Sequence, residues 1–201
     1  GINNACALVL DVETGNTLAY VGNIADAGNK EMEADVDVIA APRSPGSALK
    51  PILYASMLSD GLILPNSIIA DIPMQVGSYA PKNFDLGYDG AVPADRALSR
   101  SLNVPAVKML QQYTIDKFLD RLKQIGLSSM NRSADNYGLS LILGGGEAKL
   151  WDMCSAYASM ARVLNNYNRL QKYNSDDWNK PVYLVSKEKS LNDKQETTPL
   201  I

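Results

Sequence analysis

Residues 43–51 read Arg-Ser-Pro-Gly-Ser-Ala-Leu-Lys-Pro, and this stretch decides the fold. The Pro-Gly pair interrupts the chain, and apolar side chains then recur at every fourth position through residues 47–60, which predicts a helix. Gly61 follows directly and predicts the helix end. Pro51 agrees with a helix that starts near Ser47, because proline is tolerated in the first turn, where amide donors lack helical partners.

Ser47 and Lys50 are the candidate nucleophile and base. The sequence contains no histidine, which excludes a Ser-His-Asp triad and a Cys-His pair. A neutral lysine beside the serine remains as a way to activate the hydroxyl. Residues three apart share one face of a helix, and the N-terminal end of a helix favours an anion there. Ser186 and Lys189 have the same spacing but lie in a charged tail without a signal for a helix start.

A second polar pair, Ser101 and Asn103, belongs to a Ser-x-Asn string that occurs three times in the sequence. Only this copy lies in a short loop between two helices that prolines are predicted to open. Such a loop can hold two polar side chains rigidly in a cleft. Upstream, in the Pro-rich and mostly extended stretch of residues 62–90, Tyr79 and Asn83 either line a substrate groove or pack the loop.

The remaining elements follow from the hydrophobic pattern. Residues 5–22 predict a β-hairpin around a tight turn at 13–16. Further helices are expected at residues 93–98, 105–113, 115–125 and from 150 onward. The three glycines 144–146 are expected to form a loop, since no Gly-Lys-Ser/Thr of a phosphate site follows. In the last helix one apolar stripe is expected to face the core: Leu150, Met153, Tyr157, Met160 and Leu164.

Composition narrows the function classes. The 201 residues are 46% hydrophobic and 20% charged, which is typical of a globular domain. The net charge of −3 argues against nucleic acid as a partner, since a nucleic-acid binder needs a basic face. No apolar run is long enough to span a membrane. Cys6 and Cys154 are too few for a disulfide framework and are expected to be buried free thiols. We expect neither a cofactor nor a metal site.

Three stretches resemble penicillin-binding protein transpeptidases. RSPGSALKP at residues 43–51 is similar to the nucleophile segment of that family, and ALSRSLNVPAV at 97–107 is similar to its second motif. Ser47 and Ser101 are 54 residues apart, a separation like that of the family. YGLS at 137–140 and LGGGE at 143–147 resemble the stretch before the long central helix. The similarity covers about residues 3–166 and is strongest to the bifunctional class A enzymes.

The resemblance implies an α+β fold of the β-lactamase/transpeptidase type, with a helical subdomain packed on an antiparallel sheet. Only the N-terminal hairpin strands of that sheet are expected within this sequence. Residues 1–201 are then a partial transpeptidase domain with its helical part at 47–166. The chain begins with Gly1, and we expect it to be a piece of a longer protein.

The resemblance also implies roles for the four site residues. Ser47 would attack the penultimate D-alanine carbonyl of a peptidoglycan stem peptide, and Lys50 would take its proton. Ser101 would relay a proton to the leaving amine, and Asn103 would hydrogen-bond the substrate backbone. The expected function is a D,D-transpeptidase that also binds β-lactams. The alternatives are a serine hydrolase of the same chemistry, a D,D-carboxypeptidase or β-lactamase, and a non-catalytic envelope module.

One departure from the family pattern matters. No lysine in these residues is followed by Ser/Thr-Gly, the third motif of the family, and the nearest string, Lys189-Ser190-Leu191, fails. We therefore expect half an active site that turns over slowly or not at all. The fragment itself is expected to be soluble. The hairpin would keep an unpaired edge that favours self-association. The parent protein is expected at the periplasmic face of the bacterial inner membrane, anchored by a segment outside this sequence.

Overall fold

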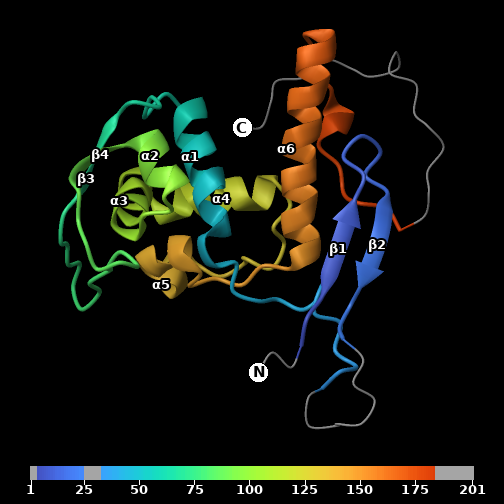
Figure 1. Ribbon diagram of the computed structural model, residues 1–201, viewed down its shortest axis with the longest axis horizontal. Coiled ribbons are helices and arrows are strands. Elements are labelled where there is room, and N and C mark those ends of the chain that lie inside the picture. Colours follow the sequence, from blue (N-terminus) through green and yellow to red (C-terminus); the bar gives the residue numbers. More distant parts are fainter. Residues whose placement is uncertain (1–3, 25–32, 184–201) are drawn as a thin grey trace. The chain divides into compact units, whose positions relative to one another are not determined.

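The computed structural model describes residues 4–24 and 33–183, which form two compact units (Figure 1). The first unit holds the chain up to residue 43, the short segment 123–129 and the chain from 148 onward. The second unit holds residues 44–122 and 130–147. Among the described helices, none is both long and apolar enough to cross a bilayer.

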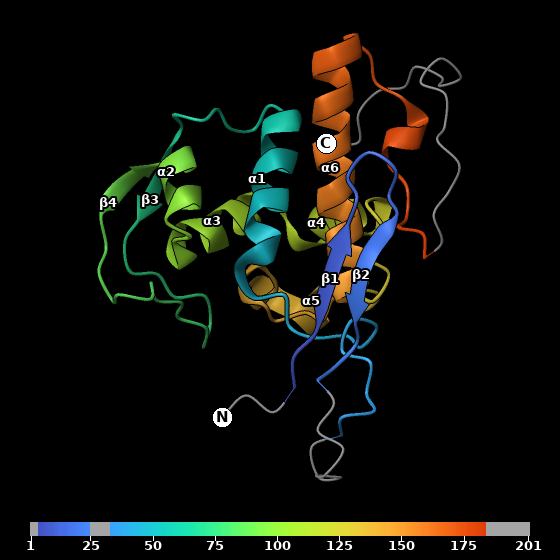
Figure 2. The ribbon, with the colours of Figure 1, turned by 45° about the vertical axis from the view of Figure 1, so that its right-hand side comes forward.

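The first unit contains the predicted hairpin. Strand β1 (Ala7–Leu10) pairs antiparallel with β2 (Thr17–Val21), and Leu8 lies opposite Tyr20. Gly15 supplies the positive φ of the turn, at +75°. Asp11 Oδ1 fixes the turn by accepting hydrogen bonds from the backbone N–H and the hydroxyl of Thr14, at 2.7 and 2.6 Å. The hairpin lies along helix α6 (Leu150–Leu170), as two views agree (Figures 1 and 2).

The prediction that the apolar stripe of α6 faces the core is wrong. Met153 is buried, but Tyr157 and Leu164 are exposed, Leu164 by 63%. Small and polar residues are buried instead, among them Ser159 and Arg162. The Arg162 guanidinium donates to the carbonyls of Val12 and Asp177, so this face of α6 is held by hydrogen bonds to neighbouring backbone. Hydrophobic periodicity does not predict this buried face, because several of its side chains are polar.

The second unit is mainly helical. Its helices are α1 (Lys50–Ser59), α2 (Ala94–Ser99), α3 (Asn103–Tyr113), α4 (Ile115–Gln124, whose last two residues belong to the first unit) and α5 (Ala134–Tyr137). A second two-stranded antiparallel sheet, β3 (Ile68–Asp71) with β4 (Gly90–Pro93), lies in the stretch expected to be extended. The core side chains come from several helices and are fully buried: Leu53, Val107, Leu110, Phe118 and Leu122.

Two helix starts in this unit differ from the prediction. Residues 46–49 form a 3-10 helix, and the α-helix begins at Lys50 rather than near Ser47. Pro51 is nevertheless in the first α-helical turn, and Gly61 ends the helix with φ +68°. Helix α3 begins at Asn103, two residues before the proline expected to open it. The Asn83 side chain accepts hydrogen bonds from the first two N–H groups of α3, a tertiary contact that local sequence does not contain.

The first glycine of the triplet 144–146 fits against the segment that precedes Ser47. Gly144 has φ +100°, and a Cβ built on it would lie 2.9 Å from both the N and the Cα atom of Gly46. The Gly144 carbonyl accepts a hydrogen bond from Ser44 Oγ at 2.8 Å. The expected loop therefore has a positioning role, because only glycine allows this close backbone approach beside Ser47.

Gly144→Ala should unfold the second unit more readily than Gly61→Ala. Both glycines have positive φ, so either alanine carries a backbone strain of about 1–2 kcal/mol. Gly61 has no atom within 4 Å of an added Cβ, whereas Gly144 meets backbone. We expect an additional loss of about 1–3 kcal/mol for Gly144→Ala, since backbone must shift. Urea unfolding of the two variants measures this difference, and equal losses would contradict the close approach.

Candidate active site

Ser47 is exposed and lies on the 3-10 helix Gly46–Leu49, in the second unit. Gly46 precedes it with φ +54°, and the Ser47 carbonyl accepts a hydrogen bond from the backbone N–H of Lys50. Within the described residues, Ser47 Oγ makes no hydrogen bond. The Ser47 side chain is exposed, whereas Lys50, three residues later, is buried. The hydroxyl is therefore open to an incoming molecule.

Lys50 is buried, with only 2% of its surface exposed. Its Nζ atom lies 2.7 Å from the carbonyl oxygen of Ser101, 3.2 Å from Ser101 Oγ and 2.7 Å from Asn103 Oδ1. Burial disfavours the charged amine and lowers the Lys50 pKa from its ordinary 10.5 to about 8. The structure thus brings three of the four sequence-predicted site residues together around one buried nitrogen.

The amine has a different set of partners in each protonation state. An ammonium has three donors, which match the three acceptors around Nζ. A neutral amine keeps two N–H donors for the two short contacts, and its lone pair then becomes an acceptor. Ser101 Oγ, the more distant partner, can donate to that lone pair. Lys50 and Ser101 can therefore exchange a proton without either side chain leaving its place.

Ser101 occupies the turn between α2 and α3 in a left-handed conformation, with φ +53°. Such a conformation is uncommon for a residue other than glycine, asparagine or aspartate. The turn is held by hydrogen bonds from the backbone N–H of Ser101 to the Leu98 carbonyl and from that of Leu102 to the Ala97 carbonyl. Both polar oxygens of Ser101 face the same Lys50 nitrogen in this arrangement.

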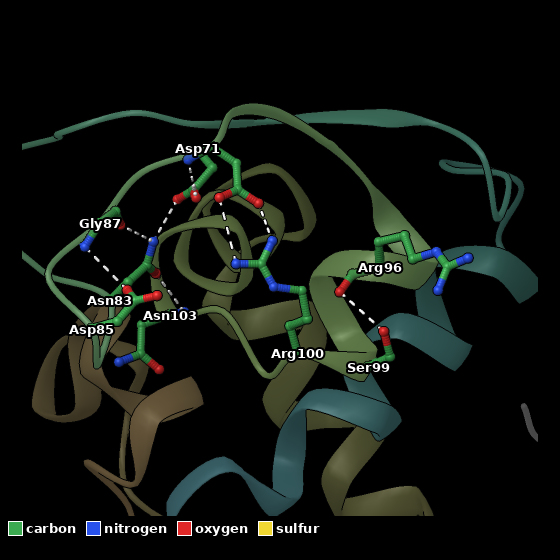
Figure 3. A network of polar contacts seen from close by, with 9 residues as sticks. Asp71, Asn83, Asp85, Gly87, Arg96, Ser99, Arg100 and Asn103 are labelled. Atoms are coloured by element: carbon green, nitrogen blue, oxygen red, sulfur yellow. Dashed lines mark hydrogen bonds and ion pairs between the residues drawn. The ribbon is translucent and has the colours of Figure 1, made fainter.

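Asn103 is the first residue of α3 rather than part of a loop. Its backbone N–H donates to Asn83 Oδ1 at 2.9 Å, and its Nδ2 donates to the Lys82 carbonyl at 3.0 Å. Figure 3 shows Asn103 beside Asn83 in a network of polar contacts that extends to Asp71. From the sequence, Asn83 could either line a substrate groove or pack within its loop. The structure supports packing within the loop, since Asn83 is 2% exposed. Among the described residues no cluster of metal-ligating side chains occurs.

Comparison with known proteins identifies the family of this chain. The penicillin-binding protein transpeptidase domain family matches residues 5–162. This chain belongs to that family. It is 41% identical over 155 residues to penicillin-binding protein 1C of Escherichia coli, an alignment that covers 77% of this chain and 20% of that protein. This transpeptidase domain sequence thus spans about a fifth of the length of the curated relatives it matches.

Solved structures show the same fold. The transpeptidase domain aligns with penicillin-binding protein 1A from Haemophilus influenzae at a TM-score of 0.65 and 25% identity, over 79% of this chain and 23% of that one. PonA1 from Mycobacterium tuberculosis, in complex with penicillin V, aligns at a TM-score of 0.67 and 23% identity, over 81% of this chain and 45% of that one. The predicted α+β transpeptidase fold is confirmed.

The Lys50 side chain should titrate far below an ordinary lysine. Because burial lowers its pKa to about 8, the ¹³Cε chemical shift of Lys50 should change with a midpoint near pH 8, about two units below a solvated lysine. Comparison with spectra of Lys50→Arg assigns the signal. A midpoint near 10.5 would show that the amine is solvated rather than buried.

Proposed function

We propose that this chain is part of a serine D,D-transpeptidase of bacterial peptidoglycan synthesis, with Ser47 as nucleophile and Lys50 as base. The observation that carries the proposal is the buried amine, which Ser101 and Asn103 surround and which lies one helical turn from an exposed hydroxyl. A serine is a poor nucleophile at its own pKa and needs an adjacent base. A lysine with a pKa near 8 is neutral often enough at physiological pH to serve.

The proposed reaction has two halves. Ser47 Oγ attacks the carbonyl of the penultimate D-alanine, and its proton passes to neutral Lys50. The peptide C–N bond then breaks, and Ser101 delivers the proton from Lys50 to the leaving D-alanine amine. An ester on Ser47 remains. The amine of a neighbouring stem peptide attacks this ester and forms the new amide of the cross-link. The ester C–O bond breaks, and a proton from the amine passes through Ser101 and Lys50 to Ser47 Oγ.

The remaining groups hold the substrate and the developing charge. One Nδ2 hydrogen of Asn103 binds the Lys82 carbonyl, and the other would donate to the stem-peptide backbone. The Ser47 N–H would donate to the oxyanion, a contact that is strongest in the transition state. A β-lactam would follow the same first half, except that its broken ring keeps the leaving nitrogen attached to the acyl group. The penicillin V bound in the PonA1 structure supports β-lactams as ligands of this site.

The parent protein would work at the periplasmic face of the inner membrane, where stem peptides are found. Its membrane anchor would belong to sequence outside these 201 residues. The third family motif, Lys-Ser/Thr-Gly, does not occur in them. A second oxyanion donor and a cation for the substrate carboxylate are what that motif would add. We therefore propose that the chain as given is acylated slowly.

Acylation by benzylpenicillin, followed by intact-protein mass spectrometry, tests the roles of Ser47 and Lys50. We expect slow addition of one acyl group, no addition in Ser47→Ala, and a rate lowered at least about 100-fold in Lys50→Ala, as for loss of a general base. The rate should rise with pH through about 8, because the base must be neutral and its pKa is lowered to that value.

Ser186→Ala is the matched control, since it removes the serine of the other Ser-x-x-Lys string. It should be acylated at the wild-type rate. No adduct on Ser47, even in the full-length parent protein, would favour the non-catalytic alternative. A parent protein that releases hydrolysed rather than cross-linked stem peptide would favour the D,D-carboxypeptidase.

Self-association through the hairpin is a separate prediction. Strands β1 and β2 form a two-stranded sheet, and apolar side chains on it are exposed: Val9 by 49%, Leu18 by 64% and Val21 by 47%. Unpaired strand edges with exposed apolar residues favour pairing with another chain. Sedimentation velocity over a hundredfold concentration range should show a rising average mass, and Leu18→Lys should reduce it. A constant monomer mass would contradict the prediction.

A further inference from the structure

Asn83 uses its whole hydrogen-bonding capacity inside the second unit. Its Nδ2 donates to Asp71 Oδ1 at 2.8 Å and to the Gly87 carbonyl at 2.9 Å. Its Oδ1 accepts from the backbone N–H groups of Asn103 and Val104, at 2.9 and 3.1 Å. An asparagine amide has two donor hydrogens and two acceptor lone pairs, so every position is filled. Figure 3 shows the amide between Asp71 and the start of α3.

Asp71 fixes which way this amide points. Its carboxylate is fully buried and accepts from Asn83 Nδ2 and from the backbone N–H of Asp89. An ionised carboxylate only accepts hydrogen bonds, so the NH₂ group of Asn83 must face it. In the opposite orientation the Asn83 oxygen would face the Asp71 carboxylate. The Asn83 NH₂ group would then face the two backbone N–H groups at the start of α3. The Asn83 oxygen is therefore held toward the start of α3.

Two consecutive residues, Lys82 and Asn83, each accept a hydrogen bond from Asn103. Asn83 Oδ1 accepts from the Asn103 backbone, and the Lys82 carbonyl accepts from Asn103 Nδ2. With its NH₂ group engaged, the side-chain oxygen of Asn103 is the atom left to face Lys50 Nζ, at 2.7 Å. A chain of contacts thus runs from a buried carboxylate, through Asn83 and Asn103, to the amine.

We propose that Asn83, oriented by Asp71, is a positioning residue of the active site that holds Asn103 Oδ1 against the Lys50 amine. The inference rests on the proposed function for its effect on acylation, but not for its effect on Lys50. Asn83 does not touch substrate in this proposal; it acts through Asn103. A purely structural role would be limited to capping α3 and would leave the environment of Lys50 unchanged.

Asn83→Ala in the 201-residue chain tests the proposal against Asn166→Ala. Asn166 is a matched control, because it is also a buried asparagine that donates to an aspartate, Asp177, but it lies in the first unit. In Asn83→Ala the side-chain amide signals of Asn103 should shift in ¹⁵N–¹H spectra. The Lys50 ¹³Cε midpoint should fall by at least half a pH unit, because an acceptor that favours the ammonium is lost. Acylation at Ser47 should slow at least tenfold. Asn166→Ala should lower stability but change none of the three.

An exchange of the two side chains sharpens the test. Asn83→Asp alone places two carboxylates against each other and should disturb Lys50. Adding Asp71→Asn restores a donor opposite an acceptor and keeps an oxygen at α3. The Gly87 carbonyl still lacks the donor that Asn83 gave it, so the double variant should recover part, but not all, of the lost acylation rate and of the Lys50 shift. Should Asn83→Ala fail to fold, Asp71→Asn alone, which keeps the side-chain shape, should move the Lys50 midpoint in the same direction by a smaller amount.

The outcomes are separable from those of the proposed function. If wild-type protein is never acylated at Ser47, the proposed function fails, while the Lys50 midpoint and the Asn103 signals still decide the role of Asn83. An unchanged or higher Lys50 midpoint in Asn83→Ala, or a change of equal size in Asn166→Ala, would overturn the inference.

Discussion

The arrangement of the site depends on one constraint, the burial of the Lys50 amine. A buried amine without hydrogen-bond partners is costly in either protonation state, so the surrounding fold has to supply acceptors. Ser101 and Asn103 supply them from a segment about fifty residues away. The same burial lowers the pKa of the amine to about 8. The burial that ties α1 to the turn between α2 and α3 thus also lowers the Lys50 pKa, as its proposed role as a base requires.

The proposed nucleophile and base differ in their exposure to solvent. Ser47 is an exposed residue of a 3-10 helix, and Lys50 is the buried first residue of the α-helix that follows. Between Ser47 and Lys50, where the 3-10 helix ends and the α-helix begins, the side chains change from exposed to buried. Gly144 packs against the backbone just before Ser47 and limits how that short segment can move. An accessible hydroxyl and a water-excluded amine can therefore be neighbours in sequence.

Local signals were sufficient for the elements whose cause is local. The turn at Gly15, the end of α1 at Gly61 and the tolerance of Pro51 each follow from the conformational limits of one residue. The four candidate site residues could also be proposed from sequence, because motif and context are contiguous, and the structure brings three of them together around the Lys50 amine. The proposed role of Asn83 could not be predicted in the same way, since it comes from contacts with residues 12 to 21 positions away. The buried face of α6 was missed for a related reason, as Arg162 is buried only because distant carbonyls accept from it.

The structure also changes the expected cost of the missing third motif. In the described residues desolvation alone lowers the Lys50 pKa to about 8, without a neighbouring cation among its causes. Burial thus lowers the Lys50 pKa without any contribution from the third motif. What the motif would add is a second oxyanion donor and a partner for the substrate carboxylate, and both act on the substrate rather than on the base. Slow acylation of this chain would then reflect weak binding and an incomplete oxyanion site, with the pH dependence of the base already in place.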